Sequence, residues 1–160
     1  MSTGLLRVAL VLIGCAACLI VGSGAMLPSG SAAECEPTQP DALGPFYKSN
    51  APVRSSVGQG YILSGEVKGS QDCSPIAKAR IEFWLAGPNG KYDDSHRATV
   101  YSDQEGRYRF ESNFPPSYFG RPPHIHIRVS AQGYRTLVTQ HYPDAEETGA
   151  IFNLIVIPSP

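Results

Sequence analysis

The sequence has no excess of basic residues, no helical periodicity of useful length, and no internal repeat. Its formal net charge is −1 at pH 7, so the composition gives no indication of a nucleic-acid partner. The two cysteines that follow residue 33 lack the CxxC spacing of a cysteine-based zinc site. What is present is one domain's worth of chain, in which 16 glycines and 14 prolines predict many turns.

The first 33 residues have the character of a secretory signal peptide. Arg7 precedes an apolar stretch with many small residues, and Ser-Ala-Ala at 31–33 resembles a cleavage site. A retained membrane anchor over residues 8–27 is the alternative, and residues 12–15 faintly resemble a lipoprotein cleavage box. We expect residues 1–33 to be removed, which gives a secreted or periplasmic protein without stable membrane association.

Removal of the leader would leave two cysteines, Cys35 and Cys73. An even pair of cysteines in an exported protein predicts one disulfide. This disulfide would tie an N-terminal arm to the first turn of the fold.

Short alternating or apolar runs follow from residue 61, and clusters of Gly, Pro, Asn and Asp separate them. The predicted strands cover residues 61–68, 79–85, 98–102, 107–112, 124–130, 134–142 and 151–157. This spacing is typical of an all-β fold, and it predicts an antiparallel β-sandwich over residues 61–160. Residues 34–60 are predicted to form an irregular arm laid over the sheets.

The strand over residues 79–85 is predicted to be central. Its alternation places Ile81, Phe83 and Leu85 on one face. Glu82 and Trp84 lie on the other face. Because both faces carry bulky side chains, both are expected to be covered.

The strongest chemical signal is His124-Ile-His126, which directly follows two prolines. Residues two apart in a strand point the same way, so both imidazoles can reach one metal ion. The prolines restrict the backbone and indicate a defined loop before the pair. The pair alone leaves the remaining ligands open. The candidates are Tyr92, Tyr118, the turn carboxylates Asp93, Asp94 and Asp103, and His96 or His141, of which His141 is the main rival.

Several stretches together resemble the intradiol ring-cleavage dioxygenases, the family of the catechol and protocatechuate dioxygenases. They are, in order, GPFY (44–47), SPIAKARIEFWLAGPNGKYDD (74–94), TVYSDQEGRYRFES (99–112) and PPSYFGRPPHIHIRVSAQGYRTLVTQHY (115–142). The resemblance covers about residues 41–142, and its most specific part is the tyrosine followed by RPPHIHI. It implies a β-sandwich that binds one non-haem iron(III).

The resemblance also implies roles for individual residues. The iron ligands would be two tyrosines and two histidines, namely Tyr92, Tyr118, His124 and His126. Arg121 would stabilise negative charge on the substrate ring, and Gln140 matches the family's glutamine in the following strand. By family analogy Tyr118, rather than Tyr92, would leave the metal and act as a base.

The implied reaction joins a small aromatic diol with O2 and opens the ring between the two hydroxylated carbons, which gives a cis,cis-muconate. A phenol titrates near pH ~10, and a trivalent cation would deprotonate it, so two phenolates suit ferric iron. Short loops around the site predict an open pocket that tolerates substituted catechols. A monomer or small homo-oligomer is expected.

Two alternatives belong to other classes. Residues 61–112 also resemble non-catalytic sandwich modules of the transthyretin-like or carboxypeptidase-regulatory kind, which would make the protein a binding module. The second alternative keeps a metal but makes it zinc or copper, held by His124, His126 and His141.

Overall fold

The computed structural model describes residues 35–117 and 119–160. The predicted leader and Tyr118 therefore lie outside the described residues. The described part contains eight strands and one short 3-10 helix: β1 (Tyr61–Gly69), β2 (Arg80–Leu85), η1 (Asp94–His96), β3 (Arg97–Tyr101), β4 (Arg107–Ser112), β5 (Ile125–Ser130), β6 (Leu137–His141), β7 (Gly149–Ile151) and β8 (Leu154–Val156). Among these residues no helix is long and apolar enough to cross a membrane.

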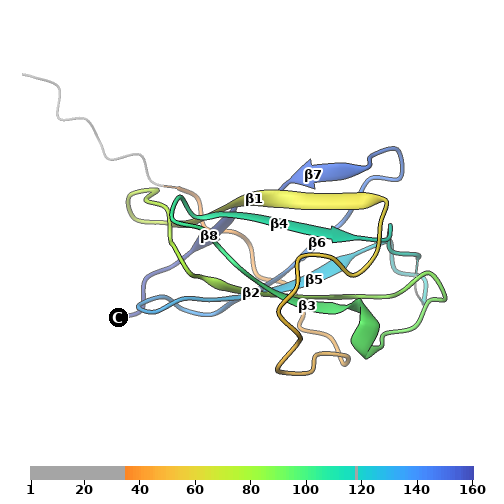
Figure 1. The fold of residues 1–160 in the computed structure, drawn as a ribbon. Helices are drawn as coiled ribbons and strands as arrows, with labels where there is room; N and C mark the ends of the chain where they lie inside the picture. The colour runs from red at the N-terminus through yellow and green to blue at the C-terminus, as the bar shows by residue number, and fades with distance from the viewer. Residues whose placement is uncertain (1–34, 118) are drawn as a thin grey trace, which may run out of the picture. The chain divides into compact units, whose positions relative to one another are not determined.

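The strands form two sheets that pack as a sandwich (Figure 1). One sheet has the order β4-β1-β7, with β8 also paired to β1, and the other has the order β3-β2-β5-β6. The predicted all-β sandwich is confirmed. The pairing is antiparallel, as predicted, except at two places. Strands β7 and β8 both run parallel to β1.

The last predicted strand is divided in two. The backbone of Phe152 lies against Gly65 in the middle of β1, where a Cβ on the glycine would be 2.7 Å from the Phe152 carbonyl carbon. Asn153 accepts a hydrogen bond from the Glu66 amide at 3.0 Å. This interruption separates β7 from β8, and each then pairs with a different half of β1.

The core lies between the two sheets. Phe83 of β2 stacks on Phe110 of β4 with ring centroids 4.2 Å apart. Ile81 and Leu85 share the core face of β2 and are fully buried with Phe83. Because β2 pairs with β3 on one side and β5 on the other, its predicted central position is confirmed.

The middle of the arm, which spans residues 35–60, covers the outer face of the β3-β2-β5-β6 sheet. Tyr47 of the arm packs on Trp84 at 5.1 Å between ring centroids. The Asp41 amide donates to the Val138 carbonyl of β6 at 2.9 Å. Trp84 is consequently 2% exposed although it points away from the core.

The start of the arm is joined to the fold covalently. Cys35 and Cys73 form a disulfide with a sequence separation of 38, as the sequence predicts. The Cys35 amide also donates to the Ser70 carbonyl at 3.2 Å. Both contacts fix the arm to the turn that follows β1.

Candidate metal centre

Four residues lie directly opposite one another on neighbouring strands and form one row across the outer sheet. The pairs are Arg97 with Trp84, Trp84 with His126, and His126 with Gln140. Residues paired in this way point to the same face of a sheet. The row therefore places His126 on the face that the arm covers, with the flat Trp84 ring stacked on it at 4.9 Å.

Tyr92 and His124 meet beside this row. The Tyr92 hydroxyl lies 3.0 Å from Nε2 of His124. The rings of His124 and His126 are 4.9 Å apart, and the Tyr92 ring is 6.0 Å from that of His126. A phenol oxygen and two imidazoles thus converge from the loop after β2 and from the start of β5.

The second nitrogen of His124 has a fixed role. Its Nδ1 lies 2.8 Å from the carbonyl of Pro122, which can only accept, so Nδ1 carries the proton. Nε2 then carries the lone pair, which accepts from the Tyr92 hydroxyl here and is the group through which a neutral histidine binds a metal. The Pro-Pro loop therefore sets the tautomer of His124 as well as the path of the chain.

Both histidines are held neutral by their surroundings. His124 is 3% exposed and His126 is 1% exposed. The pKa of His126 is lowered to about 4, chiefly by burial and then by the neighbouring His124 and Arg121. Burial is also the largest cause of the lowered pKa of His124. Neutral imidazoles are the ones that coordinate metals.

The arm forms one wall of the site. Gly44 lies so close to His126 that a Cβ on the glycine would be 2.9 Å from Cε1 of the ring. Phe46 stacks on Tyr92 with centroids 4.4 Å apart and planes 10° from parallel. The Ala42 carbonyl accepts a hydrogen bond from Nε2 of Gln140 at 2.7 Å. A single short segment thus contacts three residues of the site.

Arg121 is oriented by a small polar network. Its Nη2 donates to Oε1 of Gln140 at 2.8 Å and to the Tyr142 hydroxyl at 3.0 Å. The Tyr142 hydroxyl donates in turn to Oδ2 of Asp41 at 2.8 Å. The pKa of Asp41 is lowered chiefly by the hydrogen bond from the Ala42 amide. An anionic Asp41 therefore anchors Tyr142 beside the guanidinium.

These residues surround a pocket of about 380 Å³. Its lining consists of Pro45, Phe46, Tyr92, Phe119, Arg121, His124 and His126. The volume falls within the range of roughly 300–1,000 Å³ that small-molecule sites occupy. A mostly apolar wall with one cation and a cluster of metal-type donors suits a small aromatic ligand that carries oxygen donors.

The structure places the sequence-predicted site residues as follows. Tyr92, Arg121, His124, His126 and Gln140 lie together around this pocket. Tyr118, the remaining predicted ligand, lies outside the described residues.

The alternative zinc or copper site is not supported. His141 is paired with Ile125, so it lies on the core face of the sheet, where its Nε2 is 2.7 Å from the Tyr61 hydroxyl. Among residues 35–117 and 119–160 no group of three His, Cys, Asp or Glu side chains is arranged to hold a metal ion.

Sequence reasoning missed four contributors to the site: Asp41, Gly44, Trp84 and Tyr142. The strand period could place Trp84 on the outer face but not opposite His126. Tyr142 lies two residues after Gln140, a same-face signal that was available. No local signal connects Asp41 with Tyr142, since 101 residues separate them.

The donor set fits a ferric ion. The Tyr92 oxygen is a hard donor beside the lone pair of His124 Nε2, and imidazole suits iron. Nδ1 of His126 is buried and has no hydrogen-bond partner in the described part of the chain. A buried ring nitrogen without a hydrogen-bond partner is costly in free energy, whichever tautomer the ring adopts.

In comparisons with known proteins, the chain is similar to dioxygenases. No protein-family model matches the sequence. The chain is 33% identical over 132 residues to catechol 1,2-dioxygenase 2 of Acinetobacter lwoffii, covering 61% of this chain and 48% of that protein. It is 27% identical over 139 residues to the chlorocatechol 1,2-dioxygenase of Pseudomonas sp. strain P51, covering 66% and 55%. The chain thus spans about half the length of the curated relatives it matches.

A solved structure shares the fold. The dioxygenase domain of a dioxygenase and carbohydrate-binding protein fusion from Streptomyces sp. SirexAA-E superposes with a TM-score of 0.71. The match covers 78% of this chain and 100% of that domain at 24% identity. At this identity the likeness establishes the fold and not the substrate.

Proposed function

We propose that the chain is an intradiol ring-cleavage dioxygenase, a non-haem iron(III) enzyme that cleaves catechol-type aromatics with O2; its similarity to catechol and chlorocatechol 1,2-dioxygenases and its fold support this. One observation carries the proposal: the Tyr92 oxygen, Nε2 of His124 and the buried His126 converge in a pocket that Arg121 also lines. Tyr92, His124 and His126 would hold the iron, with Tyr118 as the fourth predicted ligand. When bound, the ferric ion supplies a hard Lewis acid for the two oxygens of a catechol.

The residues of the chain then act on the substrate. Arg121 presents a positive charge to the pocket, and Gln140 and Tyr142 fix its direction. A preorganised cation of this kind stabilises negative charge that builds on a substrate ring. Pro45 and Phe46 cover the site from the arm side and limit the access of water.

Gln140 holds Arg121 in place. It is 5% exposed, and its amide is engaged at both ends, by Arg121 on the oxygen and by the Ala42 carbonyl on the nitrogen. Tyr118 remains the predicted base that accepts a substrate proton. Both oxygen atoms of O2 enter the product, and the ring opens between the two hydroxylated carbons.

The test combines metal content with colour. Purified protein should contain iron and show a visible tyrosinate-to-iron(III) absorption band, which anaerobic catechol should shift. Tyr92→Phe should weaken or shift the band and lower catechol turnover by at least about 10²-fold, the scale of losing a group that acts directly. Tyr101→Phe, an exposed tyrosine at the end of β3, is the matched control and should behave like wild type.

Two results would contradict the proposal. A protein that stays colourless after reconstitution with iron(III) would exclude the tyrosine-iron centre. A protein that binds zinc or copper tightly and keeps that metal in Tyr92→Phe would show a centre built on histidine alone.

The pocket supports a tolerance for substituted catechols. Phe119 lines the pocket and is 88% exposed, so the rim on this side faces solvent. We expect turnover of catechol, of alkyl-substituted catechols and of hydroxyquinol with kcat/KM values within about tenfold of one another, since small apolar differences shift binding only weakly. Activity on unsubstituted catechol alone would contradict this expectation.

Export is a separate part of the proposal. It is supported by the composition of residues 1–33 and by the Cys35–Cys73 disulfide, a bond typical of oxidising compartments. N-terminal sequencing of protein recovered outside the cytoplasm should begin close to residue 34. A mature protein that still begins at Met1 would exclude cleavage.

A further inference from the structure

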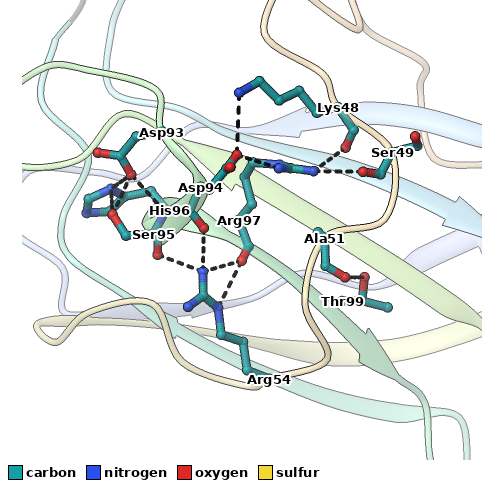
Figure 2. A network of polar contacts seen from close by, with 10 residues as sticks. All are labelled: Lys48, Ser49, Ala51, Arg54, Asp93, Asp94, Ser95, His96, Arg97 and Thr99. Carbon is teal, nitrogen blue, oxygen red and sulfur yellow. Dashed lines mark hydrogen bonds and ion pairs between the residues drawn. The ribbon is translucent and has the colours of Figure 1, made fainter.

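Arg97 is a buried arginine at the end of the row that contains Trp84 and His126. It is 9% exposed. Its Nη1 donates to Oδ1 of Asp94 at 2.6 Å, and its Nη2 donates to the carbonyls of Lys48 and Ser49 at 2.7 and 2.9 Å (Figure 2). One guanidinium therefore connects the arm to η1.

A second arginine braces the same junction from the arm side. Nη2 of Arg54 donates to the carbonyls of Asp94, Ser95 and Arg97 at 2.8, 2.9 and 2.7 Å. Its Nε donates to the Arg97 carbonyl at 3.0 Å (Figure 2). These carbonyls belong to η1 and the first residue of β3, so Arg54 fixes the backbone that carries Arg97.

The junction lies immediately after Tyr92 in the chain and beside it in space. Asp94 follows Tyr92 by two residues, and Ser49 follows Phe46, the stacking partner of Tyr92, by three. Tyr92, Phe46 and Arg97 also line one small cavity of about 90 Å³. The guanidinium of Arg97 thus holds both the segment that follows Phe46 and the segment that follows Tyr92.

We propose that Arg97 is a positioning residue for Tyr92, which it holds toward His124 by clamping arm residues 48 and 49 to Asp94. The proposal rests on the proposed function in one respect, that Tyr92 is a metal ligand. A planar guanidinium can serve acceptors in several fixed directions, and a lysine ammonium cannot reproduce that fork. Arg97→Lys should therefore restore only part of what Arg97→Gln loses.

A role in stability alone would produce a different pattern. Such a role would lower the free energy of unfolding and leave the folded site unchanged. A positioning role changes the environment of the Tyr92 ring in protein that is still fully folded. The experiment must therefore observe Tyr92 itself, below the unfolding transition.

The first measurement needs no metal. With 3-fluorotyrosine at position 92, metal-free wild type should give one narrow ¹⁹F resonance, and Arg97→Gln should give a shifted or broadened one. Arg107→Gln is the matched control, since it removes the same charge from a side chain that is 61% exposed and paired with Asp103 and Glu105. Its ¹⁹F spectrum should match wild type.

The second measurement uses iron(III) and a competing chelator. Arg97→Gln should raise the dissociation constant for iron about 10- to 100-fold, as residues that orient metal ligands do. It should also shift the tyrosinate-to-iron band, with Arg97→Lys intermediate and Arg107→Gln unchanged. If Arg97→Gln does not fold, Arg54→Gln takes its place, with the same direction of change and a smaller size.

The outcomes separate the two proposals. A wild-type protein without iron or colour would overturn the proposed function, while the ¹⁹F comparison would still decide whether Arg97 positions Tyr92. An Arg97→Gln protein with a wild-type ¹⁹F spectrum would overturn the positioning role. Wild-type iron affinity and a wild-type band in that variant would also overturn it.

Discussion

At the scale of single residues, Gly44 brings the arm against the candidate metal centre. Its φ of +73° lies in the region that L side chains rarely adopt, and the His126 ring occupies the space where a Cβ would be. The ring cannot move aside easily, because Trp84 is stacked on its face. Gly44 is therefore required both for its backbone conformation and for its lack of a side chain.

Gly44→Ala should lower the stability and the iron affinity together. Gly133→Ala is the matched control, because Gly133 has a φ of +81° and open space where its Cβ would stand. Both changes should cost about 1 kcal/mol for the backbone conformation. Only Gly44→Ala should also weaken iron binding, measured by chelator competition, and equal iron affinities in the two variants would contradict the close contact.

His141 should make the stability depend on pH. Burial lowers the pKa of His141 from its ordinary 6.5 to about 4, so the folded protein binds fewer protons than the unfolded chain between these values. The free energy of unfolding should therefore fall as the pH drops from about 6.5 to about 4. The contribution of His141 is about 1–2 kcal/mol once its partial exposure to solvent is allowed for.

The variant His141→Gln isolates this contribution. His124 and His126 act in the same direction, so the measured quantity is the difference between wild type and variant in urea unfolding at pH 7 and pH 4.5. The variant should lose stability at pH 7, because the Tyr61 hydroxyl loses its partner. It should lose less on acidification, and an unchanged pH dependence would exclude His141 as a source.

At the scale of elements, the arm forms part of the candidate site and is not a loose tail. It supplies Gly44 against His126, Phe46 against Tyr92, and the Ala42 carbonyl to Gln140. Its start is held by the disulfide, and its end by the bonds around Arg54. One side of the site is therefore formed by a segment that contains no strand.

Reduction of the disulfide should destabilise the fold more than it disturbs the site. Closing a loop of 38 residues is worth about 4 kcal/mol in the chain-entropy account. Urea unfolding with and without dithiothreitol should show a loss of about 2–4 kcal/mol. Iron affinity below the transition should change little, because Asp41 still bonds to Val138. Loss of iron on reduction alone would contradict this.

At the scale of the whole described fold, one sheet carries the site and the other supports it. The row of Trp84 and His126 lies on the outer face of its sheet, while Phe83 on the inner face of β2 stacks on Phe110 of the opposite sheet. Strand β2 thus links the core to the candidate metal centre through the adjacent residues Phe83 and Trp84. The rigidity of the site depends on the packing between the sheets.

Phe83→Ala should cost about 3–5 kcal/mol in the free energy of unfolding, as large-to-small changes in a closed core do. Ile151→Ala on β7, where the side chain is 81% exposed, should stay within about 0.5 kcal/mol of wild type. Chemical denaturation of both variants checks the contrast. Similar losses in the two would show that the sheets are not joined through this aromatic contact.

Local sequence features were sufficient to predict the all-β class, the central position of the 79–85 strand and the Cys35–Cys73 disulfide. These predictions rest on local features, because the two-residue period of a strand and the chemistry of cysteine do not depend on which distant residues lie nearby in space. The resemblance to the dioxygenases pointed to Tyr92, His124 and His126. In the structure these three side chains line one pocket, and the first two are in contact.

Which residues lie opposite one another on neighbouring strands could not be predicted from the sequence and is known only from the tertiary structure. The row from Arg97 to Gln140 depends on the register of four strands, and register is set by core packing and by turns distant in sequence. The same holds for the arm, whose contacts with the site join residues about 50 to 100 positions apart. It also holds for the division of the last predicted strand into β7 and β8, because the backbone of Phe152 approaches Gly65, which is distant in sequence.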